Sequence, residues 1–161
     1  PCDPLLRLEA IVPPDPAKMA TMAARLRLSR AEGARLSAWA MTDAIAPATG
    51  EAALARIAYR GDRQAVQDRL RLGLAAARAR AGQDAAALAE AGGYLRLLRF
   101  LDGWEKPVFP LKGGDLAALG MASGPRMGET LAALEAEWVD GGFREGRDAL
   151  LSRAAELMKD A

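Results

Sequence analysis

The chain of 161 residues contains no histidine and a single cysteine, Cys2. These absences exclude Ser-His-Asp and Cys-His catalysis and leave no plausible zinc site. A lone cysteine cannot form an intrachain disulfide, which fits a reducing compartment, and we expect a cytoplasmic protein. The sequence also lacks any Asp-x-Asp, GxGxxG or GxxxxGK[ST] pattern. A magnesium site made of carboxylates alone remains possible, but we predict no catalytic residue and no metal site in this chain.

Long apolar runs are also missing, because arginines or acids interrupt every apolar stretch. We therefore expect no membrane-spanning helix and no membrane partner, and no signal-peptide pattern is present. The net charge of +1 gives no general attraction to nucleic acid. Only four of the 22 basic residues are lysines. Arginine suits phosphate recognition, although an arginine-rich codon bias explains the ratio equally well.

Alanine and leucine dominate a sequence that is 51% hydrophobic and only 5% aromatic, which favours helix over strand. Apolar residues recur at helical spacing, and capping residues such as Asp3, Asp62 and the Ser29–Glu32 pair mark helix starts. We predict an all-α fold, an irregular array of about eight or nine short helices with no sheet. The expected helices cover about 4–11, 16–27, 30–44, 51–59, 62–81, 84–101, 115–119, 125–140 and 146–159, and the expected buried positions include Ile11, Leu88 and Leu119.

The stretch from Phe109 to Gly128 differs from the rest, since it places five glycines and two prolines around one short apolar run. It predicts a short helix, a tight turn and the start of a second helix. Two helix starts, each with free backbone N–H groups and one nearby cation, are suited to binding phosphate. The alternative is a helix-turn-helix whose glycines serve geometry alone. The phosphate-binding candidates of this stretch are Lys112, Gly113, Gly124, Arg126 and Gly128, and the candidates with a structural role are Asp115, Leu116, Leu119, Gly120 and Pro125.

A resemblance to a known family rests on this same stretch. Its Gly-x-Asp-Leu, Leu-Gly and Gly-Pro-x-x-Gly elements resemble the C-terminal region of bacterial tRNA nucleotidyltransferases, the CCA-adding enzymes that are grouped with bacterial poly(A) polymerases. The residues from Asp3 to Leu8 and from Ala24 to Glu32 also resemble helical segments of that family. The residues that match the central pattern are Gly113, Asp115, Leu116, Leu119, Gly120, Gly124, Pro125 and Gly128.

The resemblance implies a parent enzyme whose N-terminal head binds Mg²⁺ and CTP or ATP, while this chain binds no cofactor. The chain begins with proline rather than methionine, which we interpret as a piece of a longer protein. Residues 1–103 would correspond to a helical neck or body and residues 104–161 to a tail. The implied partners are that head and the phosphate backbone of tRNA, selected by shape. Arg96 and Arg99, three residues apart on one helix side, are further candidate contacts.

Two alternatives remain open. The parent protein could add poly(A) instead of CCA, and nothing in this sequence separates the two activities. The chain could also be a helical protein-interaction module without an RNA role, which its near-neutral charge and alanine-rich helices fit.

Overall fold

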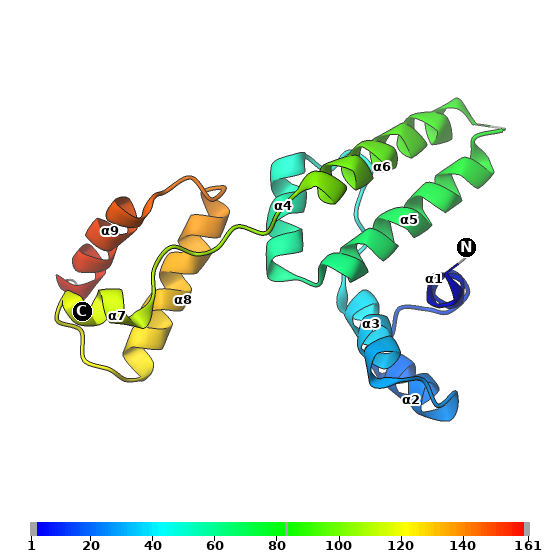
Figure 1. The fold of residues 1–161 in the computed structure, drawn as a ribbon. Coiled ribbons are helices and arrows are strands. Elements are labelled where there is room, and N and C mark those ends of the chain that lie inside the picture. The colour runs from blue at the N-terminus through cyan, green and yellow to red at the C-terminus, as the bar shows by residue number, and fades with distance from the viewer. Residues whose placement is uncertain (1–2, 83, 160–161) are drawn as a thin grey trace. The chain divides into compact units, whose positions relative to one another are not determined.

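A computed structural model describes residues 3–82 and 84–159, so Cys2 lies outside the described residues. Within them the chain forms nine helices and no strand, which confirms the all-α prediction (Figure 1). The helices are α1 Pro4–Glu9, α2 Pro16–Arg25, α3 Arg30–Met41, α4 Glu51–Arg60, α5 Arg63–Arg80, α6 Ala85–Gly103, α7 Gly113–Ala118, α8 Pro125–Asp140 and α9 Arg147–Lys159.

The chain divides after Glu105 into two compact units. Unit 1 contains α1 to α6, and unit 2 contains α7 to α9. Their assignment to a body-like and a tail-like region stays a prediction.

The helix starts of unit 1 follow from local side-chain chemistry. The Asp3 carboxylate accepts hydrogen bonds from the first turn of α1, and Asp62 accepts one from the first turn of α5. Ser29 and Glu32 form the expected capping box at α3, each accepting from the backbone N–H of the other. These predicted caps are therefore confirmed.

One core cluster of unit 1 lies where α5 and α6 run side by side and pack against α4 (Figure 1), and a second lies between α2, α3 and α5 around Trp39. Two residues of unit 1 that we predicted to be buried are exposed, so these two predictions are wrong. Ile11 is 80% exposed, because α1 ends at Glu9, ahead of Pro13, whose ring disfavours helix in the preceding residue. Leu88 is 65% exposed, because the buried side of α6 at that end consists of the smaller Ala87 and Ala91.

Two glycines of unit 1 permit close approach between segments. A Cβ on Gly73 of α5 would lie 2.5 Å from the ring of Tyr94 on α6, so this glycine lets the two helices approach closely. A Cβ on Gly93 would lie 2.5 Å from the carbonyl oxygen of Pro47. The helix α6 continues through both Gly92 and Gly93. A side chain at position 93 would therefore collide with the loop formed by residues 47–50.

Unit 2 packs α7 and α9 against α8. The expected bounds of α8 are confirmed at both ends. Trp138 of α8 packs against Phe109 and Phe143, with ring centroids 5.5 and 5.1 Å away. Its indole N–H donates to the Glu145 carbonyl at 3.1 Å. The side chain of Leu119 is exposed rather than buried, because α7 ends one residue earlier and the chain turns away.

Candidate nucleic-acid interface

The turn after α7 has the geometry predicted for a glycine-terminated helix. Gly120 has a φ of +96°, in the left-handed region that L side chains rarely adopt. Its N–H donates to the carbonyl of Ala117, and the N–H of Met121 donates to that of Leu116. This pair of bonds is the Schellman motif. Met121 is buried as Leu116 is, so Met121 supplies the anchor that we expected from Leu119.

The start of α7 is capped by its own acid. The Asp115 carboxylate accepts a hydrogen bond from the backbone N–H of Lys112 at 2.7 Å. Its other oxygen accepts one from the guanidinium of Arg147, at the start of α9. The Lys112 N–H, and after it Arg147, holds the pKa of Asp115 below its usual value. The positive end of α7 therefore already faces a carboxylate, which would compete with an incoming phosphate.

The start of α8 is more open. Gly124 precedes Pro125 and supplies no side-chain cap, and the Met127 N–H donates to the Gly124 carbonyl. Arg126 is exposed in the first turn. A hollow of about 320 Å³ lies beside this turn, lined by residues 120–126 and by Met158 of α9.

The hollow brings together only part of the predicted set. Gly124 and Arg126 line it, whereas Lys112, Gly113 and Gly128 do not. Gly128 is exposed, with open space where a Cβ would lie.

Arg96 and Arg99 belong to α6 in unit 1, whereas the glycine-rich turn belongs to unit 2. The Arg96 guanidinium donates to the Thr49 carbonyl at 2.9 Å and the Pro47 carbonyl at 3.3 Å, and it lies 3.8 Å from the Glu51 carboxylate. These contacts give Arg96 a role in holding the loop before α4. Arg99 is exposed.

Sequence reasoning missed the contact between Asp115 and Arg147. The position of Asp115 three residues into the helix indicated its capping role, since acids at this position commonly cap their own helix start. No sequence pattern pointed to Arg147, which lies 32 residues further along the chain.

Sequence reasoning also missed a charged cluster in unit 1. Arg35 donates to Asp68, which is fully buried, and to Asp3. The Glu9 carboxyl is 2% exposed, and neither of its oxygens has a hydrogen-bond partner among the described residues. Burial, followed by repulsion from Asp68, raises the pKa of Glu9 to about 7. The Arg69 guanidinium lies 4.7 Å from the Trp39 ring centroid.

Across residues 3–82 and 84–159, no group of three or more His, Cys, Asp or Glu side chains is arranged to hold a metal ion. In the same part of the chain, every helix is too short or too polar to cross a lipid bilayer.

No family model matches the chain. The mitochondrial CCA tRNA nucleotidyltransferase 1 of Mus musculus is 38% identical to it over 56 residues, and that of Homo sapiens is 36% identical over 56 residues. Each match covers 35% of this chain and 13% of the relative, so the chain spans a small part of those proteins. The partial similarity indicates a relation to the CCA-adding tRNA nucleotidyltransferases.

Proposed function

We propose that this chain is the C-terminal, non-catalytic, RNA-holding region of a bacterial tRNA nucleotidyltransferase that adds CCA to tRNA 3′ ends. The observation that carries the proposal is the 36–38% identity to two CCA tRNA nucleotidyltransferases over 56 residues. The glycine-rich turn supports it, because its open helix start and exposed Arg126 are suited to phosphate. The N-terminal head would be the intramolecular partner, and it would bind Mg²⁺ and CTP or ATP.

The contacts would be made to the sugar–phosphate backbone and would select tRNA by shape rather than by sequence. Arg126 is the leading residue, because it combines an exposed guanidinium with the uncapped start of α8. Lys112 contributes its exposed ammonium group. The α7 start at Gly113 contributes less, since Asp115 already occupies its capping position.

The test is binding of the chain to labelled tRNA by fluorescence anisotropy over a salt series. Affinity should fall linearly in a plot of log K against log salt, because phosphate contacts release counterions. The variant Lys112→Ala/Arg126→Ala should bind more weakly and with a shallower slope. Arg144→Ala/Lys159→Ala removes two exposed cations of the same unit and is the matched control. Absence of binding at low salt would refute the proposal.

Poly(A) addition by the parent protein stays a prediction of the resemblance. The names of the two similar proteins favour CCA addition. Sequencing the 3′ ends made by the full-length protein decides between the two, since one activity leaves CCA and the other a run of A.

A protein-interaction role has one observation in its favour. Unit 1 contains a hollow of about 480 Å³ with Met41, Ile45 and Ile57 in its lining, and the side chains of Met41 and Ile57 are exposed. Exposed apolar side chains that gather at a hollow are typical of partner surfaces. If tRNA binding fails while Ile57→Glu abolishes self-association in sedimentation, the interaction module replaces the RNA proposal.

A further inference from the structure

The α2–α3 corner, defined as residues 25–30, lies in a stretch without acids. Between Asp15 and Glu32 the sequence contains four cations and no acid. Lys18 is paired with Asp15 at 3.3 Å. The remaining three cations belong to the corner and are Arg25, Arg27 and Arg30.

All three arginines of the corner are exposed. In the part of the chain that the structure describes, none of their guanidinium groups has an ion pair or hydrogen bond. The two flanking acids are occupied at helix starts, since Asp15 accepts from the backbone N–H of Lys18 and Glu32 accepts from that of Ser29. The corner therefore keeps its positive charge uncompensated.

The acid-free stretch at 69–83 offers a comparison within the same unit. It also contains four cations. Three of them are used inside the molecule, because Arg69 lies over Trp39, Arg71 lies 3.7 Å from Asp68, and Arg80 binds Glu90 at 2.6 Å. The corner has no such internal use.

The backbone at Arg27 is strained. Its φ is +51°. The N–H of Arg27 donates to the Ala24 carbonyl and that of Leu28 to the Ala23 carbonyl, so Arg27 holds the left-handed position of a Schellman motif. The chain places glycine at this position after α7 and after α8. An arginine that costs stability and makes no internal contact indicates an external one, since strain persists mainly at functional sites.

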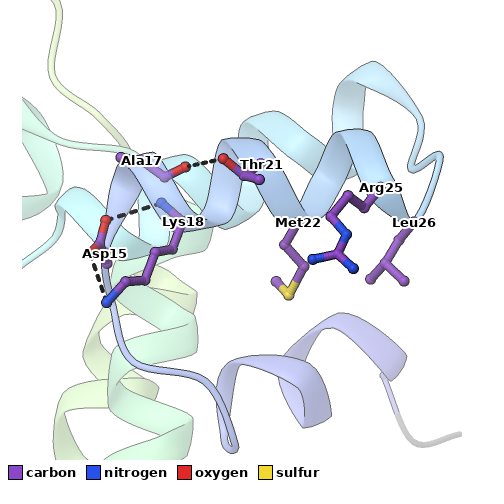
Figure 2. Close-up of a pocket in the computed structure, with 7 residues that line it drawn as sticks. All are labelled: Asp15, Ala17, Lys18, Thr21, Met22, Arg25 and Leu26. Carbon is purple, nitrogen blue, oxygen red and sulfur yellow. Dashed lines mark hydrogen bonds and ion pairs between the residues drawn. The ribbon is translucent and has the colours of Figure 1, made fainter.

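A hollow of about 750 Å³ borders the corner along α2. Figure 2 shows Met22, Arg25 and Leu26 extending from one side of α2, with Lys18 paired to Asp15 further along. The Leu26 side chain is 56% exposed. The apolar side chains of this lining can contact a ribose or the face of a base. The adjacent guanidinium can form a bidentate hydrogen bond with a phosphate.

The charge of the two units agrees with this location. Residues 1–105 contain 15 Lys and Arg against 12 Asp and Glu, whereas residues 106–161 contain seven against nine. The excess of positive charge thus lies in unit 1. An RNA backbone would be attracted to unit 1 more than to unit 2.

We propose that the α2–α3 corner is a docking surface for the phosphodiester backbone of RNA, with Arg27 and Arg30 contacting phosphates and Arg25 the adjoining hollow. This inference rests on the proposed function and adds to it a second contact surface, in the other unit. Two observations favour RNA as the occupant. The arginines of the surface are exposed and unpaired, and the chain is similar to tRNA nucleotidyltransferases.

The first experiment compares Arg27→Gly/Arg30→Ala with the wild-type chain in tRNA anisotropy between about 50 and 200 mM salt. Loss of two phosphate contacts should reduce the slope of log K against log salt by about 1.5. The control Arg7→Ala/Arg78→Ala removes two exposed, unpartnered cations of the same unit, as far as the described residues show, and should keep the wild-type slope.

The single variant Arg27→Gly separates binding from folding. Glycine relieves the strained φ, so the melting temperature should rise by a few degrees, about 4 °C. The affinity for tRNA should nevertheless fall. A variant that is more stable and binds more weakly cannot owe its weaker binding to misfolding.

Three outcomes would overturn the inference. If the wild-type chain does not bind tRNA, the proposed function fails with it. If the wild-type chain binds and the corner variant matches the control, only the α2–α3 corner is refuted. If the corner variant loses binding to phosphatidylcholine vesicles that contain phosphatidylserine, but keeps binding to tRNA, the surface is a membrane contact instead.

Discussion

Replacing Glu9 by glutamine should stabilise unit 1 above neutral pH and leave its stability nearly unchanged at about pH 4. The Glu9 carboxyl is 2% exposed and has no hydrogen-bond partner among the described residues. The charged groups around it are Asp3, at the start of α1, Arg35 of α3, and Asp68 and Arg69 of α5. Burial and the two aspartates oppose its ionisation, and the two arginines favour it.

The balance raises the pKa of Glu9 from 4.5 to about 7. Below the lower value the carboxyl is protonated in both the folded and the unfolded chain, so it does not affect the equilibrium. Between the two values the unfolded chain loses the proton first, and the free energy of unfolding falls as the pH rises. Above pH 7 the loss is complete and amounts to about 3 kcal/mol, at 1.36 kcal/mol per pKa unit. Glutamine has nearly the same volume and no charge to desolvate.

The assay is urea denaturation followed by circular dichroism at about pH 4 and pH 8, with the transitions of the two units fitted separately. The advantage of Glu9→Gln over wild type should be about 2–3 kcal/mol at the higher pH and close to zero at the lower. Glu129→Gln removes a carboxylate at an exposed position of α8 and is the control for the loss of one negative charge. An equal advantage at both pH values, or a Glu9 carbon signal that titrates near 4.5 by NMR, would refute the reasoning.

Two further predictions concern packing and capping. Gly73→Ala should cost about 2–3 kcal/mol of unit 1 stability, because its Cβ would lie 2.5 Å from the Tyr94 ring. Gly92→Ala, in open space on α6, should instead stabilise unit 1 by about 0.5–1 kcal/mol. Equal effects of the two substitutions in thermal melts would contradict the contact between Gly73 and Tyr94. Asp115→Ala should cost about 1 kcal/mol of unit 2 stability through the lost cap at α7. In a double-mutant cycle, Arg147→Ala should destabilise the Asp115→Ala variant less than it destabilises the wild-type chain. Strict additivity of the two losses would mean that the Asp115–Arg147 contact contributes nothing.

The phosphate-binding hypothesis for the glycine-rich stretch shows how far local reasoning extends. The sequence predicted a tight turn after a short helix, with a structural role for Gly120, and the α8 start at Pro125, and both are confirmed. It could not predict that Asp115 would bind Arg147, since that contact depends on the packing of α9 beside α7. For the same reason it left the two helix starts equivalent, whereas the Asp115 carboxylate accepts from the Lys112 N–H at the α7 start and no side chain caps the α8 start.

The sequence by itself determined the all-α class, the caps at Asp3, Ser29 and Asp62, and the span of α8 from Pro125 to about Asp140. These features depend on groups within a few residues of each other, so spacing along the chain is enough to predict them. Tertiary structure decided which side of α6 is buried, which arginines are bound, and which carboxyl is left without a partner. These outcomes depend on helices that are distant in sequence, because burial and ion pairing follow from packing rather than from local composition.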